Sequence, residues 1–169
     1  MTGKVLGQFF TPPIIKQMMI NLINPQLKAD GTSERIFDPA MGTGGFLISS
    51  LKHLLQQSKT KKIDVNWKFI CDEGLGGREA EPDTYQLAVS NMLISSGHMF
   101  NVLEKGDSIR NPITNKYDII LANPPFGGKE RAEVQQNFTI KTSETAYLFL
   151  QHFMKSLRAG GRAGIVIKN

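Results

Sequence analysis

Cysteine and histidine are scarce in this sequence, and their scarcity excludes two kinds of structure. The single cysteine, Cys71, cannot form an internal disulfide, and its place in an apolar run favours a buried, unreactive thiol. The three histidines lie far apart in the sequence, without cysteine pairs or clustered carboxylates beside them. We therefore predict no metal site.

Long apolar runs are missing as well. No stretch resembles a signal peptide, and none reaches the roughly eighteen apolar residues that a membrane-spanning helix needs. We therefore expect a soluble, cytoplasmic protein with no membrane part.

The composition is that of one ordinary globular domain. The chain has 169 residues, of which 40% are hydrophobic, so it is long enough for a sizeable core. Charge of one sign is only slightly in excess, because 20 lysines and arginines stand against 15 aspartates and glutamates. The resulting net charge of +5 is a weak indication of an anionic partner, since a solvated surface explains it about as well.

The stretch that organises the chain lies near its first glycine cluster. An apolar strand predicted over 35–38 ends at Asp38, and Pro39 cannot continue a central strand because proline has no amide donor. Closely spaced glycines follow, which let the backbone turn tightly and approach a ligand, and helical periodicity then predicts a helix over 44–57. Strand, glycine turn and helix indicate the nucleotide-binding opening of a doubly wound α/β sheet.

The glycine spacing excludes two common cofactor motifs. A dinucleotide fingerprint requires G-x-G-x-x-G, but the sixth position counted from Gly42 is Leu47. A Walker-type phosphate loop requires a lysine after the glycines, and none is present here. We therefore expect a ligand with an adenosine and no phosphate. The alternative is a glycine turn that only closes a strand–helix unit.

Residues 38–46, which we call the glycine loop, read Asp-Pro-Ala-Met-Gly-Thr-Gly-Gly-Phe. This stretch closely resembles the first motif of amino-methyltransferases that use S-adenosyl-L-methionine. The resemblance implies that cofactor and a Rossmann-like methyltransferase fold, an α/β three-layer αβα sandwich with a mostly parallel sheet. It also implies that these loop residues contact the cofactor: Asp38, Pro39, Ala40, Gly42 and Gly44.

A second motif precedes the glycine loop. Residues 7–12 read Gly-Gln-Phe-Phe-Thr-Pro, and Thr11 is a possible cap for a helix predicted over 13–23, with Pro12 at its first position. The same residues resemble the motif before the cofactor loop in adenine methyltransferases of the type I restriction–modification class. There the aromatic residue and the threonine contact the methionine end of the cofactor, which implies that role for Phe10 and Thr11.

A carboxylate after the second strand is expected to hold the cofactor ribose, because one carboxylate accepts hydrogen bonds from two adjacent hydroxyls. We predict that strand over 67–71. In the resembling family it ends in Gly-x-Glu, which residues 77–79 match, so the resemblance assigns the ribose to Glu79. A glycine-rich insert before this match departs from the usual spacing, and Asp72 or Glu73 is therefore an alternative at the strand end.

A third short strand, predicted over 101–104, is followed by Gly106 and Asp107. A Gly-Asp pair at this distance resembles the third motif of the family, in which the aspartate accepts a hydrogen bond from the adenine amino group of the cofactor. The resemblance implies that role for Asp107. Taken without the other motifs, an ordinary turn aspartate is the better interpretation.

The reacting residues are expected after an apolar run over 117–122, which is typical of a buried parallel strand. The run leads into Asn-Pro-Pro-Phe at 123–126. The two prolines remove amide donors and leave carbonyl oxygens, beside the side-chain carbonyl of Asn123. Two acceptors suit an aromatic amine, because taking its hydrogens favours the pyramidal nitrogen that attacks a methyl carbon. Such a site works by positioning and electrostatics.

The Asn-Pro-Pro-Phe motif resembles the catalytic motif of amino-methyltransferases that act on adenine. The resemblance implies catalytic roles for Asn123, Pro124, Pro125 and Phe126, with the last offering a face on which an extruded base stacks. Relatives with this motif modify guanine in RNA or glutamine in proteins, and a structural turn is a further alternative. Because the motif follows the two stretches described above, adenine in DNA is the expected substrate.

The remainder of the chain completes the predicted sheet. A polar loop over 127–141 leads to a helix over 143–158, capped by Ser143, and a fifth strand over 162–168 follows a glycine pair that ends the helix. A further helix is predicted over 84–96. The family's proteins have further strands and a preceding helical domain. We therefore expect the whole chain, residues 1–169, to be one incomplete catalytic domain with an exposed sheet edge.

The resemblance also implies partners. The modification subunit of a type I restriction–modification system methylates the 6-amino group of adenine in double-stranded DNA, together with a specificity subunit and a restriction subunit. This sequence shows no DNA-reading motif and no basic stripe interleaved with aromatics, which favours base recognition by a separate subunit. The alternatives are a methyltransferase for RNA or protein glutamine and a non-catalytic cofactor-binding module.

Overall fold

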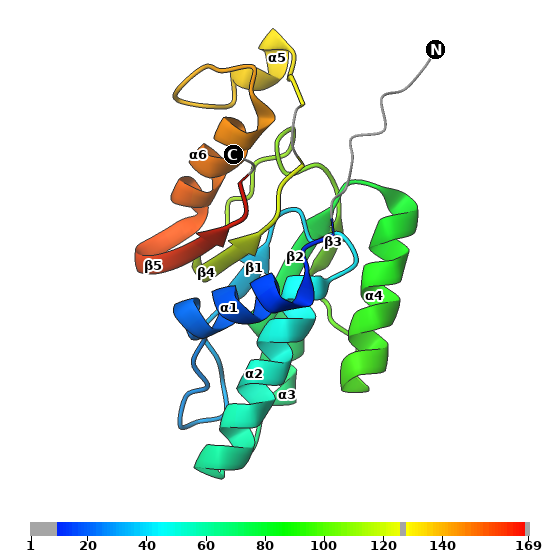
Figure 1. Ribbon diagram of the computed structural model, residues 1–169, viewed down its shortest axis with the longest axis vertical. Helices are drawn as coiled ribbons and strands as arrows, with labels where there is room; N and C mark the ends of the chain where they lie inside the picture. The colour runs from blue at the N-terminus through cyan, green and yellow to red at the C-terminus, as the bar shows by residue number, and fades with distance from the viewer. Residues whose placement is uncertain (1–9, 126–127, 168–169) are drawn as a thin grey trace.

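The centre of the molecule is a five-stranded sheet in which each strand pairs parallel to its neighbours (Figure 1). The computed structural model describes residues 10–125 and 128–167. The strand order is β3-β2-β1-β4-β5, so the chain reverses its direction of travel across the sheet between β1 and β4, where open sheets of this kind bind ligands. The strands are β1 (Ile36–Asp38), β2 (Leu75–Glu79), β3 (Leu103–Lys105), β4 (Tyr117–Ala122) and β5 (Leu157–Ile165).

Helices cover both faces of this sheet, which confirms the predicted three-layer αβα architecture (Figure 1). Along β4 the side chains alternate: Ile119 packs in a core with α1, α2 and α4, whereas Ile120 packs in a second core with α6. Burial on both faces explains why β4 reads as a nearly continuous apolar run. The helices are α1 (Pro13–Ile23), α2 (Gly45–Lys61), α3 (Trp67–Phe69), the π-helix η1 (Ile70–Gly74), α4 (Pro82–Ser96), α5 (Ala132–Gln135) and α6 (Thr145–Ser156).

The prediction of the second strand over 67–71 is wrong. Those residues form the helical turns of α3 and η1, and the glycine-rich stretch after them is the strand β2 itself. The strand needs its glycines because neighbouring segments approach closely. A Cβ on Gly77 would lie 2.7 Å from Met41 Sδ, and one on Gly76 would lie 3.0 Å from the Val102 carbonyl oxygen. What resembled an insert is therefore a strand that lets the glycine loop pack against it.

The boundary between the last helix and the last strand also differs from the prediction. The helix α6 ends at Ser156 and β5 begins at once, so the glycine pair lies inside the strand and does not end the helix. The pairing of β4 with β5 shifts register between Tyr117 and Ile119, and Gly160 adopts a φ of +77° in the same stretch. Glycine adopts this conformation without strain, which accounts for the irregular pairing.

Neither predicted side-chain cap is present. Pro12 occupies the capping position of α1 in place of Thr11, and Glu144 occupies that of α6 in place of Ser143; neither makes a capping hydrogen bond through its side chain. The loop predicted over 127–141 contains the short helix α5. The other predicted strands and helices are present with ends displaced by a few residues.

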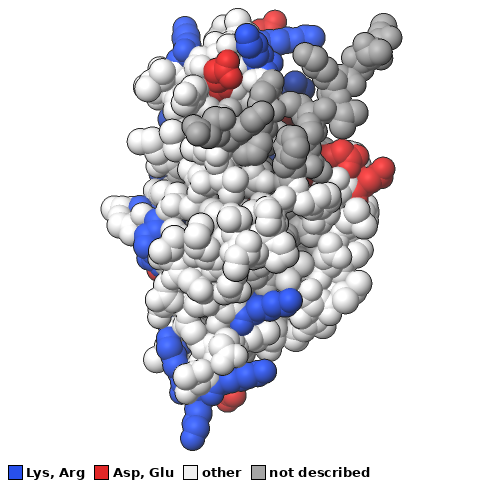
Figure 2. All heavy atoms as spheres, viewed as in Figure 1, with Lys and Arg blue, Asp and Glu red and all other residues white. Residues whose placement is uncertain are grey.

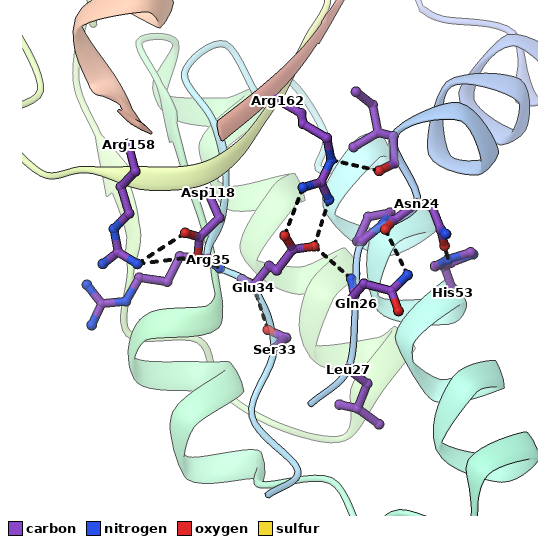
Figure 3. Close-up of polar contacts among 12 residues, drawn as sticks. Asn24, Gln26, Leu27, Ser33, Glu34, Arg35, His53, Asp118, Arg158 and Arg162 are labelled. Atoms are coloured by element: carbon purple, nitrogen blue, oxygen red, sulfur yellow. Dashed lines mark hydrogen bonds and ion pairs between the residues drawn. The ribbon is translucent and has the colours of Figure 1, made fainter. Parts of the chain in front are cut away.

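An ion-pair cluster ties the edge strand β5 to the chain before β1 (Figure 3). Arg162 donates two hydrogen bonds to the Glu34 carboxylate, at 3.0 and 2.8 Å, and a third to the Ile23 carbonyl oxygen at 3.0 Å. Beside it Arg158 pairs with Asp118 at 3.1 Å. These contacts join β5, the end of α1 and the entry to β1 at the sheet end opposite the strand carboxyl ends.

We expect the change Arg162→Met to lower the free energy of unfolding by about 1–2 kcal/mol, because it removes three charge-assisted hydrogen bonds and leaves the half-buried Glu34 carboxylate without its ion pair. The matched variant Arg158→Met breaks a single more exposed pair and should cost less than about 1 kcal/mol. Urea denaturation of both variants measures the difference. Equal losses in the two variants would show that the bidentate pair contributes no more to the free energy of unfolding than the exposed pair does.

Candidate active site

Four polar side chains from different strands meet at one edge of the sheet. Asp38 is the last residue of β1 and Glu79 the last of β2, whereas Asp107 follows β3 by two residues and Asn123 directly follows β4. Because the strands are parallel, their carboxyl ends face one side, and all four residues line a single cavity. Its empty volume, including space open to solvent, is about 1120 Å³.

Most of the residues predicted from motifs lie in the wall of this cavity. Gly44 does not, because it is buried behind the wall where it precedes α2. Phe126 lies outside the described residues. The predicted residues that line the cavity are Phe10, Thr11, Asp38, Pro39, Ala40, Gly42, Glu79, Asp107, Asn123, Pro124 and Pro125.

The glycine loop is fastened to the end of β2. The backbone amide of Met41 donates to the Arg78 carbonyl oxygen at 3.0 Å, and that of Gly42 donates to Glu79 Oε2 at 3.0 Å. Gly42 and Gly44 have φ values of +53° and +85°, in the region that favours glycine. These two conformations turn the backbone along the cavity before α2 begins.

Asp38 is a buried carboxyl group at the centre of the site. Its side chain is almost fully removed from solvent, and Oδ1 accepts a hydrogen bond from the Ala40 amide at 3.0 Å. Burial raises the pKa of Asp38 to about 8; the Ala40 hydrogen bond opposes this shift and the nearby Glu79 charge adds to it. The site therefore holds a carboxyl that ionises readily only when a positive group comes near.

This raised pKa predicts a specific pH dependence of stability. Unfolded Asp38 ionises near its ordinary pKa of 3.8, whereas the folded protein keeps the proton up to about pH 8. The folded state binds more protons between these values, so the contribution of Asp38 to the free energy of unfolding falls as pH rises through that window. The change Asp38→Asn should gain stability relative to wild type from pH 5 to pH 8, by at most about 1.4 kcal/mol per pH unit. Urea denaturation across this range tests it, and a pH-independent difference would contradict it.

Glu79 is the strand-end carboxylate of β2, as the motif predicted. It is buried, and its two oxygens accept from backbone amides at either side: Oε2 from Gly42 at 3.0 Å and Oε1 from Glu81 at 2.9 Å. The two alternatives lie in η1 and do not line the cavity. Asp72 pairs with Lys68, and Glu73 pairs with Arg35.

Asp107 stabilises a turn and also lines the cavity. Its Oδ1 accepts from the backbone amides of Ile109 at 2.8 Å and Arg110 at 3.2 Å, which is the arrangement of an aspartate turn. The next residue, Ser108, donates to the Pro39 carbonyl oxygen at 2.7 Å and so joins this turn to the glycine loop. The turn interpretation and a cofactor contact are therefore compatible.

The residues after β4 form the part of the wall that follows the strand next to β1. Pro124 is buried, whereas Asn123 and Pro125 are half-buried. The preceding residue, Ala122, accepts a hydrogen bond from the Val166 amide at 3.0 Å, which fixes the end of the strand. Acceptor groups are thus held at the rigid end of β4, the strand that pairs with β1 and its terminal Asp38.

Sequence reasoning missed several residues of the wall. Ser108 has a sequence signal, because it adjoins the predicted Asp107. Lys16 and Thr145 have none, since they belong to helices whose packing alone brings them to the cavity. Thr145 is 3% exposed, and its hydroxyl has no hydrogen-bond partner among the described residues.

No helix within residues 10–125 and 128–167 is long and apolar enough to cross a membrane. The same residues contain no group of three or more His, Cys, Asp or Glu side chains placed to hold a metal ion.

The strand order and the strand-end site define a Rossmann-like fold of the methyltransferase class. A crystal structure of a putative class I S-adenosylmethionine-dependent methyltransferase from Listeria monocytogenes shares this fold, with a TM-score of 0.71 at 20% identity over 97% of this chain and 47% of that one. The family described as N-6 DNA Methylase matches residues 1–169, and the chain belongs to that family.

Two more similar proteins are methylase subunits. The type I restriction enzyme EcoEI methylase subunit of Escherichia coli is 32% identical over 166 residues, which cover 95% of this chain and 32% of the relative. The crystal structure of the type I restriction enzyme EcoKI M protein has a TM-score of 0.80 at 28% identity, over 94% of this chain and 33% of that one. The chain thus spans about a third of the length of these relatives.

Proposed function

We propose that this chain is the catalytic domain of an adenine-specific DNA methyltransferase, which transfers a methyl group from S-adenosyl-L-methionine to the 6-amino group of adenine. One observation carries the proposal. Carboxyl groups at the ends of β1 and β2 and the Asn-Pro-Pro segment after β4 line the same cavity, so cofactor and target amine can share it. Family membership and the resemblance to type I methylase subunits support the same reaction.

The acidic side chains of the cavity fit this cofactor. Asp38, Glu79, Asp107 and Glu130 line it, which suits a ligand that carries positive charge and ribose hydroxyls and has no phosphate. When bound, the cofactor supplies a methyl group on a sulfonium leaving group. In this proposal Glu79 accepts from the ribose hydroxyls, Asp107 from the adenine amino group, and Phe10 and Thr11 contact the methionine end.

The task of the chain is then to orient the amine and bind its hydrogens. Asn123 Oδ1 and the Pro124 carbonyl oxygen accept the two amine hydrogens, which localises the lone pair toward the methyl carbon. These acceptors sit on the rigid end of β4, so little reorganisation is needed as charge develops. Pro125 fixes the loop, and Phe126 stacks on the extruded base.

We further propose that the protein acts as the modification subunit of a type I restriction–modification complex. Specificity and restriction subunits and double-stranded DNA are then its partners. On the face shown in Figure 2, the lysine and arginine side chains of the described residues are separated by wide uncharged areas and form no continuous basic stripe. A separate subunit that reads the bases is consistent with this surface.

Methyl transfer from labelled cofactor to duplex DNA, RNA and protein tests the proposal directly. The intact protein, supplied with its specificity subunit, should label DNA, and nucleoside analysis of the product should show N6-methyladenine. Label confined to RNA or to glutamine would replace DNA as the substrate. Cofactor binding without transfer to any of the three would identify a binding module instead.

A further inference from the structure

Lys16 is a cation in the wall of an otherwise acidic cavity. Among the described residues that line the cavity it is the only lysine or arginine, against the carboxyl groups of Asp38, Glu79, Asp107 and Glu130. It forms no ion pair or side-chain hydrogen bond with any described residue. Lys16 is half-buried, lines the cavity together with four carboxyl groups and pairs with none of them, so its ammonium can serve an anionic group of a ligand.

The position of this ammonium is set by the packing of α1 on α2 (Figure 1). Lys16 Nζ lies 2.9 Å from the point that a Cβ would take on Gly45, the first residue of α2. Because glycine has no Cβ, the lysine side chain can pack against this residue. The ammonium therefore lies beside Gly45, where the glycine loop leads into α2, and Lys16 lines the same cavity as Thr11.

The proposed cofactor has one group that this cavity otherwise leaves unmatched. Its sulfonium and its α-ammonium are cations, and its ribose and adenine donate hydrogen bonds, so the carboxylates of the wall suit all of these parts. Its α-carboxylate is the single anion, and carboxylates in the wall would repel it. We propose that Lys16 pairs with the α-carboxylate of the methionine part and thereby selects cofactors that keep this group.

This inference rests on the proposed function. A comparison of two ligands tests the role of Lys16 separately from cofactor binding itself. Titration calorimetry on the intact protein should use S-adenosyl-L-methionine and decarboxylated S-adenosylmethionine, which keeps the sulfonium, the amine and the adenosine. Wild type should bind the complete cofactor about tenfold or more tightly than the decarboxylated one, as expected for a charge-assisted hydrogen bond.

The change Lys16→Met should remove that preference. Affinity for S-adenosyl-L-methionine should fall about tenfold, whereas affinity for the decarboxylated ligand should stay the same, and Lys16→Arg should keep most of the preference. The matched control is Lys52→Met, since Lys52 lies on α2 outside the cavity and its loss should leave both affinities unchanged. Thermal unfolding of each variant shows that the fold is intact.

The possible results separate a failure of the proposed function from a failure of the proposed role of Lys16. A wild type that binds neither ligand overturns the proposed function and this inference with it. Equal losses for both ligands in Lys16→Met, or no loss, overturn the inference alone. Unchanged cofactor affinity with a raised KM for DNA would assign Lys16 to a nucleic-acid phosphate and also overturn it.

Discussion

Replacing Asn123 with alanine should lower the rate of methyl transfer by about a hundredfold or more and leave cofactor affinity unchanged. Asn123 follows the last residue of β4, whereas the proposed strand-end contacts to the cofactor belong to β1, β2 and the turn after β3. The substitution removes one acceptor whose partner becomes more acidic as the transition state forms. Its effect should therefore fall on turnover and not on ground-state binding.

Single-turnover methylation and cofactor titration, both on the intact protein with its partners, measure the two quantities separately. The change Asn123→Asp keeps an acceptor oxygen and should retain more activity than Asn123→Ala. The control Asn101→Ala removes an exposed asparagine that hydrogen-bonds Asp72 and does not line the cavity, and it should be neutral for turnover. If Asn123→Ala methylates DNA at a rate near wild type, the residue takes no part in the chemistry.

The parts of the site that sequence reasoning located share one physical pattern. Asp38 is the last residue of one apolar strand and Asn123 directly follows another, and an apolar run that leads to a polar residue can be recognised from the sequence alone. The parallel topology then brings these residues to one edge, because parallel strands end on the same side.

The second strand was predicted at the wrong residues because its position depends on tertiary packing. Leu75–Glu79 contains two adjacent glycines, which local propensity disfavours in strands, and the apolar run before it looked like a better candidate. The glycines are needed because Met41 and Val102 approach the strand too closely for a side chain. That requirement arises only after the glycine loop and the turn before β3 have packed.

Lys16 was missed for a related reason. Periodicity identifies which side of α1 is apolar, but it does not say what a lysine near the start of that helix will face. The answer depends on the approach of α1 to α2 at Gly45, where a missing side chain leaves room for the ammonium. Helix-to-helix placement of this kind lies outside the reach of a single sequence.

The cofactor should depend on Glu79 more than on any other carboxylate near β2. We expect Glu79→Ala to weaken S-adenosyl-L-methionine binding by about a hundredfold or more, since two hydrogen bonds from ribose hydroxyls to a charged group are lost, each worth about 1.5–3 kcal/mol. The same change releases the Gly42 and Glu81 amides, which the carboxylate holds at 3.0 and 2.9 Å, so the glycine loop loses its tie to β2.

The variant Glu79→Gln separates these two effects, because its single carbonyl oxygen can hold one amide but cannot serve both amides and the ribose. It should bind the cofactor more weakly than wild type and more tightly than Glu79→Ala, with thermal unfolding reporting whether the loop stays packed. Asp72→Asn and Glu73→Gln are matched controls, since both carboxylates pair outside the cavity, with Lys68 and Arg35. Calorimetry should give both controls the affinity of wild type. A loss of binding in either control, with Glu79→Gln unaffected, would move the ribose contact to that residue.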